Sequence, residues 1–487
     1  MIKHIDILGH ADFGGAFRKT SDVPGLCTFY SAIESVKNSN ADGTLILDAG
    51  DNFCRKFWGG KKVMDGLSII GTDAMTLGNH EFDYGKEFLI SSIKDCKFPV
   101  LCANVLDKES GKLIEGTLPY TICIKKGIKI GIVGVTTEYT PYMVEKSAFQ
   151  PFKMTSVVDA LKKFIPIMRG EGAEIIVVLA HIPFYFDECG YSGELKQVID
   201  NSPSADVWIG GHIPGDFAQV IGDISVVKGG FGGNSLPHIS LAFDTDCNKI
   251  TSQISEIIDV NKFSRRNCNP LIQQFVIETT GKFEEYFREE LGVLEQTLTM
   301  QLAKESTLGN FLADSLREII KTDLSYVNTT STGERIEKGI ITRESIMNAM
   351  RFDDPILQAN IKGQDLIDLM KLVYEPERFS NNAGLAFSGY IVEVDNKADK
   401  YNKVKGVYME NGTPIGPEEY YTVVTSKYMA SGGNDTYLVS KRLDWIDTGR
   451  TMHEVIFEYV SKKKVVLPTK LGRLIMEGMP EGNNAPF

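Results

Sequence analysis

The sequence lacks the features that mark several large classes of protein. No stretch approaches the roughly 18 consecutive apolar residues that a membrane-spanning helix needs. There is no low-complexity segment and no internal repeat. The first ten residues, MIKHIDILGH, lack the basic segment and the following apolar stretch of about 7–15 residues that form a secretory signal. We therefore expect a cytoplasmic protein with no membrane partner, although a secreted chain trimmed of its leader would begin in the same way.

Positive charge is also scarce. The 487 residues include 52 Lys and Arg against 64 Asp and Glu, which gives a formal net charge of −12. Such a surface repels phosphate backbones, so we expect no nucleic-acid partner. A small anionic substrate is still compatible with this charge, because a bound cation reverses its sign locally.

The eight cysteines are scattered, with no CxxC pair and no zinc-finger spacing. This distribution favours reduced and mostly buried thiols over a disulfide framework or a structural zinc site. The chain is too long for one ordinary core and suits two domains of about 200 residues or more. Its composition, 43% hydrophobic and 24% charged, is that of a globular protein.

The first half of the chain alternates short apolar runs with helical patterns, as a layered α/β domain does. The candidate strands are 5–8, 43–50, 99–105, 128–135, 174–182 and 206–211. Polar residues follow the ends of several of them, namely Asp12, Asp51, the segment 78–83, His181 and His212. Because ligands of open α/β sheets gather at the carboxyl ends of the strands, these residues are expected to form one cluster.

The pattern changes near residue 270. Apolar residues recur there at intervals of three and four among many glutamates, which predicts one long amphipathic helix up to residue 294. We therefore expect a catalytic domain at 1–268, a linker helix at 269–294 and a second domain at 295–487. The second domain mixes strands with helices at 308–320 and 364–374, so it is also α/β.

Carboxylate and amide oxygens and neutral imidazole are the ligands of borderline divalent cations. The chain has only seven histidines, and any one of them alone is best explained as a surface or core residue. Their context changes this interpretation, because three of them follow apolar strands. His80 lies in LGNHEFD, His181 in LAHIP and His212 in IGGHIP, while Asp51 ends the segment DAGD.

Four segments in the same order resemble a known family. They are GD (50–51), GNHEFDYG (78–85), GGH (210–212) and LGNFLAD (308–314). The sequence is similar in these segments to the calcineurin-like metallophosphoesterases and, within them, to the 5′-nucleotidases. The resemblance implies a four-layer αββα metal domain, a linker helix and a C-terminal nucleotide-recognition domain. It also implies a metal-dependent hydrolase that acts on a nucleotide or a related phosphomonoester.

The resemblance assigns roles to individual residues. One divalent ion would be held by Asp51, Asn79, His181 and His212. His80 would stabilise charge on the phosphoryl oxygens or on the leaving group, oriented by Asp83. These ligand types suit Zn, Mn and Fe alike, so the sequence does not name the metal.

The second metal site of the family is incomplete in this chain. Asp12 and the shared carboxylate remain, but Gly14 and Pro214 stand where the family has side-chain ligands. We therefore expect one firm ion and a weak or absent second one. His10 is the candidate for rebuilding the site, since on an extended strand it would point to the same side as Asp12. Asp216 is a weaker candidate.

The substrate-recognition residues of the family are only partly present. Phe352 and Tyr428 occupy the positions of two rings that clamp a base, and Asn328 is retained. Asn434 stands at the position of a ribose-binding aspartate, with Asp435 next to it. The expected arginines are replaced, one by Gly333 with Arg335 nearby and the other near Leu302 and Lys304. This predicts weak or altered recognition of a nucleoside monophosphate.

Two other interpretations remain open. In the first, the chain is a degenerate member of the family that binds metal or ligand with little hydrolysis. In the second, it is a diesterase or a nucleotide pyrophosphate hydrolase. The loss of phosphate-gripping arginines suits a differently substituted substrate. The sequence decides neither the oligomeric state nor a rotation between the domains.

Overall fold

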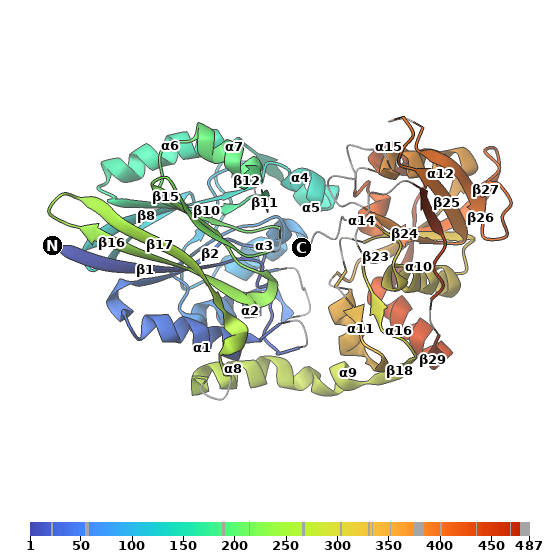
Figure 1. Ribbon diagram of the computed structural model, residues 1–487, viewed down its shortest axis with the longest axis horizontal. Coiled ribbons are helices and arrows are strands. Elements are labelled where there is room, and N and C mark those ends of the chain that lie inside the picture. Colours follow the sequence, from blue (N-terminus) through green and yellow to red (C-terminus); the bar gives the residue numbers. More distant parts are fainter. Residues whose placement is uncertain are drawn as a thin grey trace. The chain divides into compact units, whose positions relative to one another are not determined.

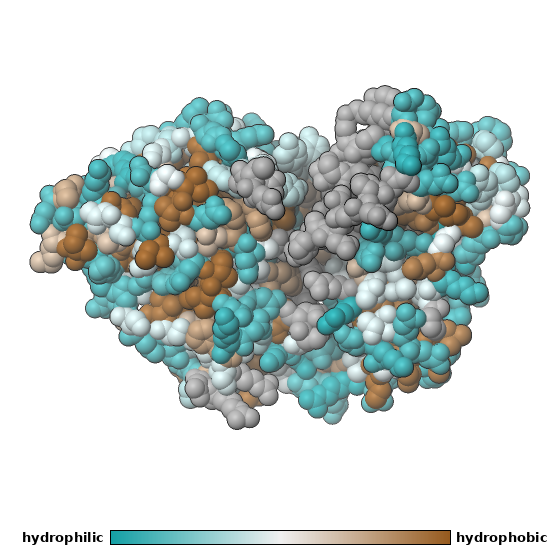
Figure 2. All heavy atoms as spheres, viewed as in Figure 1, coloured by the Kyte–Doolittle hydropathy of each residue, from teal (hydrophilic) through white to brown (hydrophobic). Residues whose placement is uncertain are grey.

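The computed structural model describes residues 1–20, 23–53, 58–187, 190–213, 215–264, 268–301, 304–329, 332–333, 335–350, 352–374, 384–399, 402–434, 436–467 and 469–477. The chain divides into two compact units, Met1–Lys282 and Phe283–Pro486. Among the described helices, none has the length and hydrophobicity to cross a bilayer. On the face shown in Figure 2, hydrophobic side chains occur in small groups separated by hydrophilic ones.

The first unit contains two large sheets. The seven-stranded sheet has the order β17 (Lys249–Asp259), β16 (Ser235–Asp244), β1 (Ile2–His10), β2 (Thr44–Asp48), β3 (Ala74–Thr76), β4 (Val100–Leu101) and β6 (Thr117–Leu118). The six-stranded sheet has the order β14 (Phe217–Ile221), β15 (Ile224–Lys228), β13 (Val207–Gly210), β10 (Ile175–His181), β8 (Ile128–Thr136) and β7 (Tyr120–Lys125). The strands predicted at 43–50, 128–135, 174–182 and 206–211 correspond to β2, β8, β10 and β13.

Helices cover the outer faces of the two sheets (Figure 1). Those whose buried residues join the core of the seven-stranded sheet are α1 (Leu26–Lys37), α2 (Gly60–Ile70), α3 (Gly85–Ile93) and α8 (Pro270–Thr280). Those packed on the six-stranded sheet are α6 (Val157–Gly170) and α7 (Glu194–Asn201). Smaller elements complete the unit: β5 (Val105–Asp107), β9 (Phe152–Met154), β11 (Phe184–Asp187), β12 (Gly190–Gly193), α4 (Thr140–Met143) and α5 (Lys146–Phe149).

Side-chain alternation along the buried strands produces the layers. In β1, Ile5 and Ile7 enter the core between the sheets, whereas Leu8 faces the helices on the outer side. In β10, Val177 enters the core between the sheets and Val178 packs beneath α6 and α7. Both faces of these strands are therefore apolar, as expected for strands between covering layers. The unit is a four-layer αββα domain, as the sequence predicted.

The second unit is built on the sheet β24 (Leu385–Ser388), β20 (Leu324–Asn328), β27 (Tyr420–Ser426), β23 (Pro355–Lys362) and β28 (Ile446–Thr451). One face packs against α10 (Thr307–Ile320), α11 (Arg343–Ala349) and α16 (Met452–Lys463), and the other against α12 (Gly363–Tyr374) and α15 (Tyr437–Ser440). The predicted helices at 308–320 and 364–374 are confirmed as α10 and α12. The remaining elements are β19 (Leu298–Thr299), β21 (Arg335–Ile336), β25 (Tyr390–Asp395), β26 (Val404–Met409), β30 (Leu474–Glu477) and α14 (Lys427–Ala430).

The linker differs from the single helix predicted up to residue 294. Helix α8 ends at Thr280, a 3₁₀ turn follows at Gly281–Phe283, and α9 (Glu284–Arg288) completes the helical part. Residues Glu290–Leu294 instead form β18, which pairs with β22 (Gly339–Thr342) and β29 (Val465–Val466). The helical prediction is wrong here because strand partners distant in the sequence satisfy the backbone and override the local pattern.

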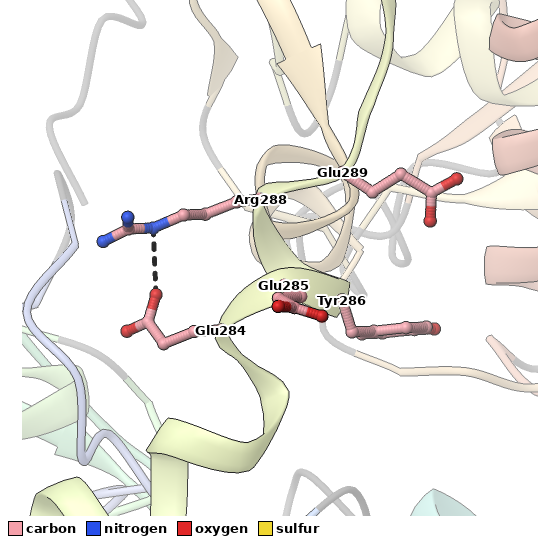
Figure 3. Close-up of a pocket in the computed structure, with 5 residues that line it drawn as sticks. All are labelled: Glu284, Glu285, Tyr286, Arg288 and Glu289. Carbon is pink, nitrogen blue, oxygen red and sulfur yellow. Dashed lines mark ion pairs between the residues drawn. The ribbon is translucent and has the colours of Figure 1, made fainter.

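An open cavity of about 530 Å³ lies beside α9. Its lining residues are Glu284, Glu285, Tyr286, Arg288 and Glu289 (Figure 3). The guanidinium of Arg288 pairs with Glu284 at 2.9 Å. The cavity is acidic, and all of its lining residues belong to the linker. None of the strand-end residues of the first unit lines it.

The loops that carry that cluster meet at one edge of the αββα domain. Strand β1 runs parallel to β2, and β10 runs parallel to β13, so their carboxyl ends lie together in each sheet. Three polar residues in these loops have left-handed backbone, with φ of 55° at Asp12, 62° at Asp51 and 77° at His212. Non-glycine residues adopt this conformation only where the surroundings hold them, which is common at functional sites.

A buried carboxylate joins two of the loops. Glu81 is fully buried, and its two oxygens accept hydrogen bonds from the backbone N–H groups of Asp51, Asn52, Phe53 and Gly78 at 2.6–3.2 Å. The donors belong to the loops that follow β2 and β3. Burial raises the pKa of Glu81 to about 7, although the backbone donors oppose this rise.

We predict that Glu81→Gln destabilises the first unit. An amide keeps one acceptor oxygen, so at least one buried N–H group loses its partner, at about 1–3 kcal/mol for each group. Thermal unfolding of the unit measures the effect, with the exposed Glu109→Gln as the matched control. An unchanged melting temperature in Glu81→Gln would contradict this account of the loops.

A second prediction concerns pH. His238 on β16 bridges Asp6 on β1 at 2.8 Å and Glu256 on β17 at 3.0 Å. Burial lowers the pKa of His238, but the two carboxylates raise it by more than burial lowers it. The pKa of His238 is therefore above its ordinary value. Its stabilising contribution is therefore full below the ordinary pKa and is lost as pH rises through the raised value. We expect His238→Gln to lower the melting temperature more at about pH 6 than at about pH 9. The exposed His4→Gln should show no such difference.

Candidate metal centre

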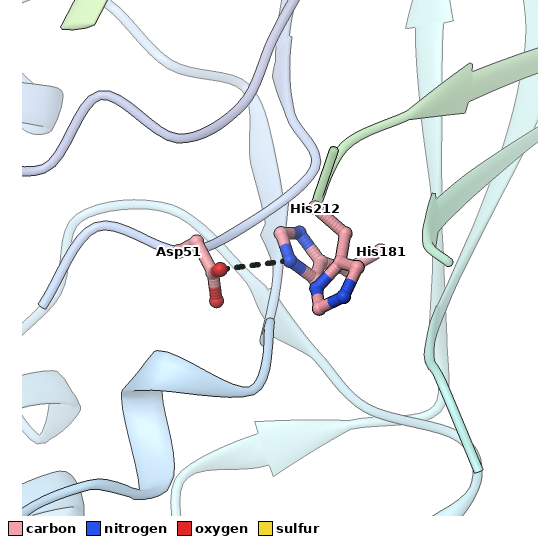
Figure 4. A group of neighbouring side chains, drawn as sticks. All are labelled: Asp51, His181 and His212. Atoms are coloured by element: carbon pink, nitrogen blue, oxygen red, sulfur yellow. Dashed lines mark ion pairs between the residues drawn. The ribbon is translucent and has the colours of Figure 1, made fainter. Parts of the chain in front are cut away.

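Three side chains gather at the carboxyl ends of the strands. Asp51 follows β2, His181 ends β10, and His212 follows β13. One ligand atom of each lies within 4.8 Å of the other two, and Figure 4 shows the two rings beside the carboxylate. His181 Nε2 is 2.9 Å from Asp51 Oδ2. Both of these residues are buried and His212 is half-buried, so the cluster is shielded and still accessible.

The donor set fits a divalent cation. His181 Nδ1 lies 2.7 Å from the carbonyl oxygen of Ala49, and a carbonyl only accepts, so Nδ1 carries the proton. The other ring nitrogen, the buried Nε2, therefore faces Asp51 and is the atom that could ligate an ion; it makes no hydrogen bond of good geometry within the described residues. Asp51 favours a proton on this nitrogen, and a bound cation would take the place of that proton. An imidazole whose other N–H is held by a backbone carbonyl is the usual arrangement of a metal-ligating histidine.

Asn79 lies at the same point, as the sequence predicted. It is buried, and its Oδ1 is 2.7 Å from His212 Nδ1. Gly78, the preceding residue, has no space for a side chain, because a Cβ atom there would lie 2.2 Å from Asp51 Oδ1. The structure thus brings together all four residues that the sequence assigned to one ion.

His80 and Asp83 form a pair beside this cluster. His80 Nδ1 is 2.7 Å from Asp83 Oδ2, and His80 Nε2 is 3.9 Å from Asp51 Oδ2. Burial lowers the pKa of His80, but Asp83 and Asp51 raise it to about 10 overall. The ring is therefore cationic at neutral pH. It is also 24% exposed at the rim of the cluster, where it can donate a hydrogen bond to an anion.

Charge in the cluster is unevenly shared. Burial would raise the pKa of Asp51, but His181 and His80 hold it below its ordinary value. Burial would lower the pKa of His181, but Asp51 raises it to about 9. His212 has its pKa lowered to about 3 by burial and by His181, so it is neutral and suited to bind a cation.

Asp12 is placed differently from the other predicted ligands. Its buried carboxylate accepts a hydrogen bond from the backbone N–H of His212 at 3.1 Å. Burial raises its pKa to about 6, while His181 opposes the rise. Within the described residues, Asp12 is not part of the group of close His and Asp ligand atoms.

Among the described residues, the region beside Asp12 shows no further His or carboxylate grouped with it as for a second metal site. Gly14 has φ +57°, and a Cβ atom there would lie 3.3 Å from the ring of Phe231, which occupies the space. Asp216 is exposed and accepts a hydrogen bond from the Ser235 hydroxyl. Pro214, the other position where a ligand was expected, lies outside the described residues.

His10 does not reach the cluster. Its ring packs edge-on against Phe29 of α1 at 5.3 Å, and its Nδ1 is 3.7 Å from Asp48 Oδ2. Burial lowers its pKa to about 3. The strand ends at His10 and the chain then turns at Asp12, so the rule that alternate residues share a side no longer applies. The hypothesis that His10 rebuilds the second site is wrong.

Two residues near the cluster were not identified from the sequence. Glu81 lies within the GNHE segment, but its four backbone partners are known only from the structure. Lys228 ends the apolar strand β15 and is fully buried. A lysine at the carboxyl end of a buried strand was the signal that sequence reasoning overlooked.

The predicted substrate residues lie on segments that meet at one edge of the five-stranded sheet. Asn328 ends β20, and Tyr428 follows β27, which runs parallel to β20. Phe352 precedes β23, whose first residues pair with the end of β27. The Tyr428 hydroxyl donates to Asn434 Oδ1 at 3.2 Å. Topology therefore places these four residues near the same edge.

The polar part of this surface is reduced. At Gly333 a Cβ atom would lie 2.6 Å from the carbonyl oxygen of Asn348, so the backbone here excludes an arginine. Arg335 pairs with Glu337 at 2.9 Å, and both are exposed. Lys304 is exposed, and Leu302 and Asp435 lie outside the described residues.

Comparisons with known proteins agree with this arrangement. The calcineurin-like phosphoesterase family matches residues 20–216, and the 5′-nucleotidase C-terminal domain matches residues 288–441. The 5′-nucleotidase of Rattus norvegicus is 25% identical over 507 residues, covering 93% of this chain and 85% of that protein. The endonuclease YhcR of Bacillus subtilis is 25% identical over 509 residues, covering 96% of this chain and 39% of that protein.

Solved structures show the same fold. The 5′-nucleotidase precursor of Thermus thermophilus superimposes with a TM-score of 0.85 at 22% identity, covering 98% of this chain and 100% of that one. The two family matches follow one another along the chain and fall within its two units. This chain therefore belongs to the 5′-nucleotidase family and is a hydrolase of the metallophosphoesterase type.

Proposed function

We propose that this chain hydrolyses a phosphomonoester of a nucleotide or a related compound, using one divalent ion held by Asp51, Asn79, His181 and His212. The proposal rests on one observation: these four side chains lie together, beside His80, in the loops that follow the strands. The metal is Zn, Mn or Fe, because this donor set suits each of them.

The protein groups divide the work around the phosphoryl group. A divalent ion at this centre supplies Lewis acidity toward a phosphoryl oxygen. The cationic His80 donates a hydrogen bond from Nε2 to a phosphoryl oxygen or to the leaving group. Asp83 keeps the ring in the required orientation and maintains its charge through the 2.7 Å contact. The buried loops exclude bulk water from the other side of the centre, which strengthens these charge interactions.

The second unit supplies the recognition surface for the rest of the substrate. In this proposal Phe352 and Tyr428 stack on a base, and Asn328 and Asn434 bind the sugar or base edges. The nucleotide as substrate class is supported by the match to the 5′-nucleotidase C-terminal domain. Among the described residues, Gly333 excludes an arginine and Arg335 is paired with Glu337, so these two positions contribute little to binding an anionic group of the substrate.

A phosphodiester is the second candidate substrate. A diester carries one negative charge fewer than a monoester dianion, so it requires fewer cationic partners, and this surface has lost them. The match to the endonuclease relative covers 96% of this chain and 39% of that protein at 25% identity, and it is compatible with the same alternative. A panel of nucleoside monophosphates, cyclic nucleotides, dinucleotides and p-nitrophenyl esters, each with Mn²⁺, Zn²⁺ and Fe²⁺, separates the two. Absence of turnover throughout the panel would leave a degenerate binding protein.

The role of His80 gives a direct prediction. His80→Ala and Asp83→Asn should each lower kcat by about 10²-fold or more, because they remove a positioned acid or its orienting group. Metal content should remain unchanged in both, since neither residue is assigned as a ligand. The control is His4→Ala at an exposed position. Equal activity of His80→Ala and the wild type would refute the proposed chemistry.

The two rings are tested by comparing substrates. Phe352→Ala and Tyr428→Ala should raise KM for a nucleotide by about tenfold, because base stacking contributes about 1–3 kcal/mol per base. They should leave p-nitrophenyl phosphate kinetics unchanged, since that substrate has no nucleobase. The exposed Tyr420→Ala in the same unit serves as the control. A parallel loss for both substrates would show that the rings are structural.

A further inference from the structure

His453 is a buried histidine at the start of α16, and its ring contacts the neighbouring segment 350–354. His453 Nε2 lies 2.8 Å from the carbonyl oxygen of Met350. A carbonyl only accepts hydrogen bonds, so Nε2 carries the proton and donates. The face of the imidazole stacks on the ring of Phe457, with the ring centres 5.9 Å apart. The imidazole is therefore held in one orientation, with its donor directed at the segment.

The backbone at the start of α16 holds the other end of the same segment. The N–H group of Met452 donates to the carbonyl oxygen of Asp354 at 2.9 Å, and the N–H group of His453 donates to Asp353 Oδ1 at 2.9 Å. The first N–H groups of a helix have no partner within the helix, and the helix dipole favours a carboxylate beside them. The segment thus satisfies the helix start, and the helix start fixes the segment.

Phe352 lies between these two attachments. Segment 350–354 connects the end of α11 to the start of β23. Met350 is held on one side of Phe352, and Asp353 and Asp354 are held on the other. Because the connection is short, attachment at both ends restricts the backbone at Phe352. A ring that is already in position when a ligand arrives loses less conformational freedom on binding.

The identity of residue 453 matters for one of the three contacts. The other two use backbone N–H groups, which any residue except proline supplies. The contact with Met350 instead requires a side chain that donates a hydrogen bond at the position of Nε2. Without this donor, the Met350 carbonyl loses a buried hydrogen bond, and that end of the segment is released.

We propose that His453 is a positioning residue for substrate recognition, whose Nε2–H group holds the Met350 carbonyl and thereby places the Phe352 ring for stacking on a base. The inference rests on the proposed function, in which Phe352 stacks on the base of a nucleotide. His453 is only 8% exposed, so it acts on the substrate through Phe352 and not by direct contact. Its effect is therefore confined to substrates that carry a base.

Steady-state kinetics of the full chain with Mn²⁺ test the proposal. Adenosine monophosphate carries a base, whereas p-nitrophenyl phosphate does not. His453→Leu keeps an apolar side chain of moderate size but removes the donor. It should raise KM for adenosine monophosphate by about tenfold, as Phe352→Ala does, because base stacking is lost when the ring is not held. The value of kcat, and both constants for p-nitrophenyl phosphate, should stay unchanged.

Two matched variants separate the hydrogen bond from the stability of the helix start. In His453→Gln the amide nitrogen replaces Nε2 as the donor, so KM should lie within about threefold of the wild-type value. Glu454→Ala removes the hydrogen bond from the Thr451 N–H group to Glu454 Oε2, which is 3.1 Å long. This substitution should lower the melting temperature and leave KM unchanged, because the lost contact lies at the same helix start but does not involve segment 350–354.

A double-mutant cycle tests whether His453 acts through Phe352. In the Phe352→Ala background, His453→Leu should raise KM for adenosine monophosphate no further, since the ring that it positions is absent. In the Tyr428→Ala background, which keeps Phe352, the same substitution should still raise KM by at least about threefold. Effects that multiply in the Phe352→Ala background would overturn the proposal.

Asp353→Ala gives a second measurement if His453→Leu does not fold, because Asp353 is exposed and forms the attachment on the other side of Phe352. It should also raise KM for adenosine monophosphate and leave p-nitrophenyl phosphate kinetics unchanged. If Phe352→Ala raises KM while His453→Leu and Asp353→Ala do not, the inference is overturned and the proposed function stands. If Phe352→Ala has no effect, or the wild type hydrolyses neither substrate, the proposed function itself fails.

Discussion

The candidate metal centre depends on the buried carboxylate of Glu81. Its oxygens bind N–H groups of the loop after β2 and of the loop after β3, and these loops carry Asp51, Asn79 and His80. The distance between these residues is therefore set by hydrogen bonds to the backbone and not by the metal. A preformed centre of this kind loses little conformational freedom when an ion binds. The left-handed backbone at Asp51 is held in place by the same contacts.

Charge balance is the second constraint on the centre. Asp51 and Asp12 are both buried, and a pair of buried carboxylates is unstable without cations. Asp51 faces His181 and His80, while Asp12 accepts a hydrogen bond from the backbone N–H of His212. The two carboxylates thus have different partners.

In the second unit, the residues proposed for substrate recognition lie near one edge of the five-stranded sheet. The ends of β20 and β27 and the start of β23 lie together, and the residues between elements project from them. Aromatic residues are retained at this edge, whereas the expected arginine position is a glycine without space for a side chain. Stacking tolerates many bases, but charge recognition requires defined partners. The retained residues at this edge therefore suit stacking on a base better than binding of an anion.

The alternation of strands and helices predicted a layered α/β first domain, and the family resemblance added its αββα arrangement, the order of the two units and the four residues assigned to one ion. Strand ends and short motifs are local, and parallel strands bring their carboxyl ends together wherever the sheet forms. Three features were decided only by the tertiary structure. The segment 290–294 became a strand because its partners lie far along the chain, and His10 faces the helices because its strand ends before Asp12. Lys228 is buried with its ammonium 4.5 Å from the ring centre of Phe184, a residue far from it along the chain, so only the packing of the elements places it there.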